Sequence, residues 1–248
     1  MKKKIRAVSI IISLMLTMAG VCGCGNKAAS IEESVDVDNA ELLQEAEEKK
    51  YAPLYIAKIE ELRSSGMADQ FALPDIDSDG TPELIASDTA GSYDHDNAFI
   101  YTAYKGEAVL LASGITGVDG TSLSYSEGKN IIRISGGMAG MKDVFYEIRD
   151  GELAEVLKTE MINTLETDAD GDEIYKYRID GNEVEEAAYY KKLNDFISAY
   201  LPLVRIDQDG LNKLSYTYED GYASFEPTGT DSYSSSQEIL GILQGMEP

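Results

Sequence analysis

One short acidic stretch constrains the fold of this chain more than any other. Residues 71–88 read FALPDIDSDGTPELIASD, with apolar residues on both sides of an acidic centre. Asp75, Asp77, Asp79 and Glu83 place four carboxylates within nine residues, and such a group repels itself unless a cation neutralises it. The flanking apolar runs are short and rich in strand formers, so the stretch predicts a strand, a tight metal-binding loop and a second strand.

The chemistry of these residues favours calcium as the metal. Oxygen-only ligands suit a hard cation, and a loop of this size wraps Ca²⁺ more readily than Mg²⁺, which demands strict octahedral geometry. Gly80 stands sixth when counted from Asp75, and glycine permits the positive φ that turns a chain around an ion. The alternative interpretation is a solvated acidic turn in an acidic protein.

The pattern D-x-D-x-D-G resembles the calcium loops of two families. In the EF-hand a bidentate Glu stands at the twelfth position, where this chain has Ala86. The nine-residue form with an acid at its ninth position is similar to the loops of integrin-type FG-GAP repeats, although Glu replaces the more usual Asp here. That resemblance implies five ligands: the side chains of Asp75, Asp77, Asp79 and Glu83 and the backbone carbonyl of Thr81.

A longer resemblance points to an uncharacterised family of lipoproteins from anaerobic, Clostridia-like Gram-positive bacteria. It rests on the acidic loop and continues through IYTAYKGE at residues 100–107 and RISGGMAGMKD at residues 133–143. The family implies a lipid-anchored extracytoplasmic protein, and it carries no activity that would transfer to this chain.

Two weaker acidic patterns follow the first. Residues 167–173, TDADGDE, contain Asp168, Asp170 and Asp172, and residues 206–211, IDQDGL, contain Asp207 and Asp209. Both include Asp-Gly, a common hairpin turn, so turn chemistry alone explains them. A second metal site at either place stays open at this point.

The N-terminus has the form of a targeting segment. Four basic residues within the first six precede an apolar stretch at residues 7–21, which is short for a membrane span. Gly23-Cys24 then resembles the lipobox of bacterial lipoproteins, which implies a signal peptide at residues 1–23 and lipidation of Cys24. An ordinary secretory signal and an uncleaved anchor are the alternatives. Residues 24–50 are expected to be a flexible acidic tether that ends in a thin helix at 39–50.

Charge limits the partners of the mature protein. The chain has a formal charge of −24, and removal of the first 23 residues, which hold four basic and no acidic residues, takes it to −28. Such a surface argues against nucleic acid and against binding anionic lipid headgroups by charge. We therefore expect attachment to the bilayer, on the extracytoplasmic face of the cell membrane, through N-terminal acyl chains.

Residues 51–248 are expected to form a single α+β domain, in which one antiparallel meander sheet of six to eight short strands is flanked by two or three helices. A fragmentary β-propeller is the alternative, but no repeat period supports it. The predicted helices span residues 51–63, 182–200 with Asn182 as its cap, and 235–243. The predicted strands lie at 98–104, 107–113, 121–126, 130–135, 144–149, 152–158, 173–179, 203–210 and 215–225, in addition to those beside the acidic loop.

Two hypotheses for function follow. The first is a non-enzymatic binding or structural module that uses calcium and takes an extracellular glycan or protein ligand, with sixteen tyrosines and no tryptophan available for stacking or for ordinary strand packing. The alternative is a carboxylate-dependent hydrolase of cell-wall or dietary glycans. His95 is the only histidine and no cysteine follows Cys24, so a histidine triad or a zinc site of the usual kind cannot be built.

Overall fold

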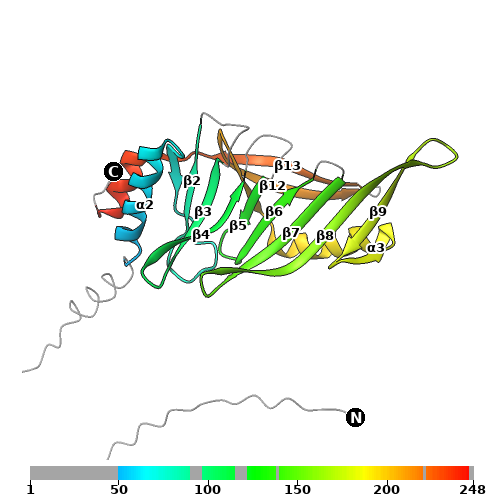
Figure 1. Ribbon diagram of the computed structural model, residues 1–248, viewed down its shortest axis with the longest axis horizontal. Coiled ribbons are helices and arrows are strands. Elements are labelled where there is room, and N and C mark those ends of the chain that lie inside the picture. Colours follow the sequence, from blue (N-terminus) through cyan, green and yellow to red (C-terminus); the bar gives the residue numbers. More distant parts are fainter. Residues whose placement is uncertain (1–49, 90–96, 115–121, 138–139, 220–221, 246–248) are drawn as a thin grey trace, which may run out of the picture. The chain divides into compact units, whose positions relative to one another are not determined.

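The structure is a computed structural model that describes residues 50–89, 97–114, 122–137, 140–219 and 222–245 (Figure 1). The predicted signal peptide, Cys24, nearly all of the tether with its helix, and His95 lie outside the described residues. Across the part of the chain that is described, no helix combines the length and the apolar character needed to cross a membrane.

Of the three helices within the described residues, two begin and end within two residues of the predicted bounds. Helix α2 spans Ala52–Ser65 and ends at Gly66, whose φ of 69° is left-handed and whose backbone N–H donates to the carbonyl of Arg63. Helix α4 spans Ser236–Leu243 and begins with a capping box between Ser235 and Glu238.

Helix α3 differs from the prediction at its start. It spans Glu186–Tyr200, so the prediction that Asn182 caps it is wrong. Asn182–Val184 instead form strand β10, which pairs with β9 across a turn at Asp180 and Gly181, with φ of 49° and 80°. Positive φ at two successive residues is typical of the tight hairpin turn that Asp-Gly favours, and this turn returns the chain to the sheet before the helix begins.

The α+β class is confirmed, but the strands form two antiparallel sheets instead of one (Figure 1). The first has the order β14-β1-β2-β3-β4 and the second the order β10-β9-β8-β7-β6-β5-β11-β12-β13. The strands of the first sheet are β1 (Gln70–Ala72), β2 (Leu84–Ser87), β3 (Ala98–Tyr104), β4 (Glu107–Gly114) and β14 (Ser234–Ser235). Those of the second are β5 (Ser122–Ser126), β6 (Ile131–Gly136), β7 (Gly140–Arg149), β8 (Glu152–Thr167), β9 (Glu173–Ile179), β10, β11 (Leu203–Asp207), β12 (Gly210–Glu219) and β13 (Tyr222–Asp231).

The division into two sheets depends on contacts that local sequence does not encode. β14, near the C-terminal end, pairs with β1, so Gln70 lies opposite Ser235. β11 pairs with β5 across about half as long a stretch of chain, which places Val204 opposite Tyr125. A pattern of consecutive hairpins predicts a meander, but it does not show where one sheet ends and another begins.

The core has three parts, and alternate strand residues supply different parts. Leu84 packs with helices α2 and α4 on one face of the first sheet, whereas its neighbour Ile85 packs between the two sheets. In the second sheet Ile132 belongs to the inter-sheet cluster and Ile131 to the cluster beneath helix α3. Because successive side chains of a strand point to opposite faces, these runs build layers of helices, sheet, sheet and helix.

Candidate metal site

The acidic loop connects two neighbouring strands of the first sheet. β1 and β2 are antiparallel, and Phe71 lies opposite Ala86. The backbone N–H of Glu83 donates to the carbonyl of Pro74 over 2.8 Å, which closes residues 75–83 into one loop. The predicted order of strand, loop and strand is therefore confirmed.

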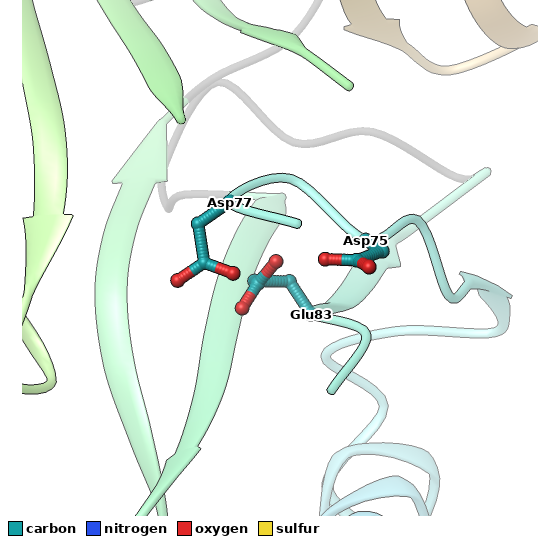
Figure 2. A group of neighbouring side chains, drawn as sticks. All are labelled: Asp75, Asp77 and Glu83. Atoms are coloured by element: carbon teal, nitrogen blue, oxygen red, sulfur yellow. The ribbon is translucent and has the colours of Figure 1, made fainter. Parts of the chain in front are cut away.

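Three carboxylates converge inside this loop. Asp75, Asp77 and Glu83 each offer an oxygen, and these oxygens all lie within 4.8 Å of one another. Figure 2 shows the three side chains directed toward a common space. One oxygen of Asp75, Oδ1, is buried and has no hydrogen-bond partner within the described part of the chain. A buried carboxylate oxygen without a partner is costly, and a bound cation would remove that cost. The cluster can thus hold a metal ion.

The structure does not bring Asp79 into this group. Its side chain is exposed, and its Oδ1 accepts the backbone N–H of Thr81 over 2.7 Å. The predicted roles of Asp79 and of the Thr81 carbonyl as ligands therefore stay predictions.

The loop backbone is held by its own acidic side chains. Asp77 Oδ1 accepts the N–H of Asp79 at 3.1 Å, and Asp75 Oδ2 accepts the N–H of Gly80 at 3.3 Å. Ser78 and Gly80 have φ of 61° and 86°. A Cβ at Gly80 would meet no atom within 4 Å, so the glycine is required for its backbone conformation and not for space.

Glu83 is the buried member of the group, at 1 % exposure. Its Oε2 accepts the N–H of Ile76 at 2.8 Å, and its Oε1 accepts the hydroxyl of Thr102 at 3.2 Å. Burial raises the pKa of Glu83 to about 8, and the charge of Asp77 adds to the effect, while the two hydrogen bonds oppose it. Burial, followed by the charge of Asp79, also raises the pKa of Asp77. A cation between these groups would favour their ionised forms.

The loop also touches elements outside its own hairpin. The hydroxyl of Tyr55, on helix α2, donates to the carbonyl of Pro82 at 2.8 Å. Toward the second sheet, the carbonyls of Asp75 and Ile76 accept the N–H groups of Gly128 and Asn130 at 2.9 and 2.7 Å, from the turn between β5 and β6. The side chain of Ile76 is fully buried in the inter-sheet cluster. The loop therefore joins the two sheets.

The two weaker acidic patterns form turns. In the first, Asp168 Oδ1 accepts the N–H groups of Asp170 and Asp172, and these bonds lower the pKa of Asp168. In the second, Asp207 pairs with Arg205 at 2.6 Å beside the β11–β12 turn. Among the described residues, only Asp75, Asp77 and Glu83 form a group of three potential metal ligands.

The sequence did not indicate Thr102 or the β5–β6 turn as parts of this site. Both lie far from the loop along the chain, and sheet pairing and sheet packing bring them there. Comparison with known proteins adds no assignment, because no family model, curated protein or solved structure matches the chain.

Proposed function

We propose that this chain is a lipid-anchored, extracytoplasmic module without enzymatic activity, in which residues 75–83 bind Ca²⁺ and thereby stabilise the loop that joins the two β-sheets. The observation that carries this proposal is the convergence of Asp75, Asp77 and Glu83 around a buried oxygen that lacks a partner among the described residues. The three converging side chains offer carboxylate oxygens, which suit a hard cation, and the irregular loop tolerates the higher coordination number of Ca²⁺ better than the strict octahedron of Mg²⁺.

The expected affinity is low, as in other extracellular calcium modules, with a dissociation constant of about 10⁻⁴–10⁻³ M. At a free calcium concentration tenfold above that constant, binding adds about 1.4 kcal/mol to the free energy of unfolding. The module's ligand is proposed to be extracellular. The formal charge of −28 after signal removal repels the phosphates of nucleic acid, which argues against nucleic acid as a partner.

Calorimetric titration of the full chain in non-ionic detergent tests the metal site. We expect one Ca²⁺ per chain, weaker binding of Mg²⁺, and loss of Ca²⁺ binding in Asp77→Asn. Asp170→Asn is the matched control, because it makes the same change in a D-x-D-G turn that lacks the converging group. Absence of heat at 10 mM calcium, or equal loss of binding in the control, would show that residues 75–83 form an acidic turn and not a calcium site.

Anchoring is tested separately, by fractionating cells that express the chain. Cys24→Ser is expected to move the protein from the membrane fraction to the soluble extracytoplasmic fraction. Cys22→Ser, two residues earlier in the same segment, is expected to leave it in the membrane fraction. If both variants stay with the membrane, the N-terminal segment is an uncleaved anchor and not a lipoprotein signal.

A further inference from the structure

A cavity of about 660 Å³ lies between helix α3 and the second sheet. Strands β7, β8 and β9 supply part of its wall, β13 contributes Phe225, and α3 contributes several side chains. Figure 1 shows α3 against this end of the sheet. The volume is within the range of small-molecule sites, and no residue of the acidic loop stands among the described residues that line the cavity.

Aromatic rings form much of this wall. Tyr177, Tyr189 and Tyr190 contact one another, with ring centroids 5.1 to 5.8 Å apart, and Tyr218 stacks on Tyr190 at 5.6 Å. Tyr189 is buried in the core beneath α3, but Tyr177 and Tyr190 are only partly buried. The cluster thus continues the hydrophobic core into a partly enclosed cavity.

The charged residues that line the cavity are all acidic. Asp143, Asp172, Glu173 and Glu186 contribute carboxylates, and no lysine, arginine or histidine stands among the described lining residues. The hydroxyl of Tyr177 donates to Glu186 at 3.1 Å, so this ring and this carboxylate hold each other in place.

The most buried carboxylate of the cavity wall, that of Asp143, uses only one of its two oxygens in hydrogen bonds within the described part of the chain. Asp143 is 1 % exposed, and its Oδ1 accepts both Nε and a terminal nitrogen of Arg133, at 2.8 and 2.6 Å. The second oxygen, Oδ2, is buried and has no hydrogen-bond partner among the described residues. Arg133 lies over the ring of Phe225, 4.4 Å from its centroid, so the arginine is held between the ring and Asp143. Arg133 and Phe225 thus position the Asp143 carboxylate in the cavity wall.

We propose that this cavity binds a small organic cation with an ammonium head group. Aromatic faces attract such a cation through their quadrupoles. Arg133 already offsets the charge of Asp143, so the other lining carboxylates, Asp172, Glu173 and Glu186, neutralise the charge of the ligand. Quaternary and methylated ammonium groups are recognised in cages of this composition. A neutral sugar would also use the aromatic faces and would donate hydroxyl hydrogen bonds to the carboxylates, but only a cation would neutralise the charge of this lining. The acidic surface of the whole chain also favours the approach of a cation.

Calorimetry on the full chain with choline as the probe tests this proposal. 3,3-Dimethylbutan-1-ol is the neutral control, because it has the same shape as choline with carbon in place of the charged nitrogen. We expect choline to bind at least tenfold more tightly than this alcohol, equivalent to about 1.4 kcal/mol. Chelation of calcium does not enter the test, so its outcome is separate from that of the acidic loop.

Two pairs of variants assign the binding to this cavity. Glu186→Gln removes an exposed lining carboxylate, and we expect a three- to tenfold loss of choline affinity with unchanged affinity for the alcohol. Glu60→Gln makes the same change on helix α2, away from the cavity lining, and is expected to change neither. Tyr190→Leu is expected to weaken choline binding tenfold or more, whereas Tyr190→Phe keeps the ring and most of the affinity. Melting curves confirm that each variant is folded.

Three results would overturn the proposal. Equal binding of choline and the alcohol would show an apolar cavity without charge recognition. Binding of a neutral disaccharide but not of choline would assign the cavity to a glycan. Absence of choline binding at 10 mM, measured on the wild-type chain, would refute the proposal whatever the behaviour of the variants.

Discussion

Glu83→Gln is expected to make the metal-free protein more stable and to remove its response to calcium. The reason is that Glu83 is 1 % exposed, and burial raises its pKa from 4.5 to about 8. At a pH between these two values, Glu83 keeps its proton in the folded state and has lost it in the unfolded state. The free energy of unfolding therefore falls as pH rises from 4.5 to 8, until ionisation is complete in both states.

The size of this effect follows from the same interval. Each pH unit between 4.5 and 7 is worth about 1.36 kcal/mol, so Glu83 costs the metal-free protein roughly 3 kcal/mol at pH 7. The amide introduced by Glu83→Gln would carry no such cost. Its carbonyl oxygen can accept the N–H of Ile76, and its NH₂ group can donate to the hydroxyl of Thr102, which rotates to accept. Allowing for imperfect packing of the amide, we expect a gain of about 1–3 kcal/mol.

Urea unfolding with chelator at pH 5 and pH 7, repeated with 10 mM calcium, measures the effect. Wild type is expected to be less stable at pH 7 than at pH 5 in chelator and to recover with calcium. Glu83→Gln is expected to lose the calcium response and most of the pH dependence, since the raised pKa of Asp77 leaves a smaller one. Glu60→Gln, an exposed control on α2, is expected to keep both. If Glu83→Gln is less stable than wild type in chelator at pH 7, Glu83 is ionised and well solvated, and the reasoning fails.

The contacts of the loop and helices give three further predictions. Gly80→Ala should lower the free energy of unfolding by about 1–2 kcal/mol through its left-handed φ alone, since no atom blocks the new methyl group. An equal loss in the calcium-bound and chelated proteins, measured by urea unfolding, would support this origin. Tyr55→Phe should cost about 0.5–1.5 kcal/mol by removing the hydrogen bond to Pro82, and an unchanged urea midpoint would show that water replaces it. Ser235→Ala should cost about 1 kcal/mol by removing the cap of α4, while Ser235→Asp should restore most of the thermal stability.

Much of the fold could be predicted because its signals are local. The turn at Asp150 and Gly151 has positive φ at both residues, and the hairpin that it predicts is the β7–β8 pair. Competition between two local signals explains the error at Asn182. The Asp180-Gly181 turn is also a local signal, but the prediction gave more weight to the helical pattern that follows it, and a three-residue strand carries too little periodicity to compete.

The candidate metal site was predictable only in part. Spacing brought forward four acids, Asp75, Asp77, Asp79 and Glu83, and the structure brings three of them together without Asp79. Thr102 could not be predicted, since its contact with Glu83 requires β3 to pair beside β2. The cavity beneath α3 had no signal either. Its tyrosines follow ordinary strand and helix patterns, and only the packing of α3 on the second sheet brings them to one wall.

The position of the acidic loop indicates how an ion would act on stability. Ile76 is fully buried between the sheets, and the carbonyls of Asp75 and Ile76 pair with Gly128 and Asn130 of the other sheet. Opening the loop would expose Ile76 and leave both N–H groups unpaired, so the loop cannot open without disturbing the inter-sheet core. Calcium should therefore shift the urea midpoint and leave the slope of the transition unchanged, because the same surface is exposed on unfolding in both cases. The amides of Gly128 and Asn130 should exchange with solvent only on global unfolding, with or without the ion. Exchange of these two amides in chelator that is faster than global unfolding allows would mean that the loop opens locally without the ion, and that its hydrogen bonds to the second sheet depend on calcium.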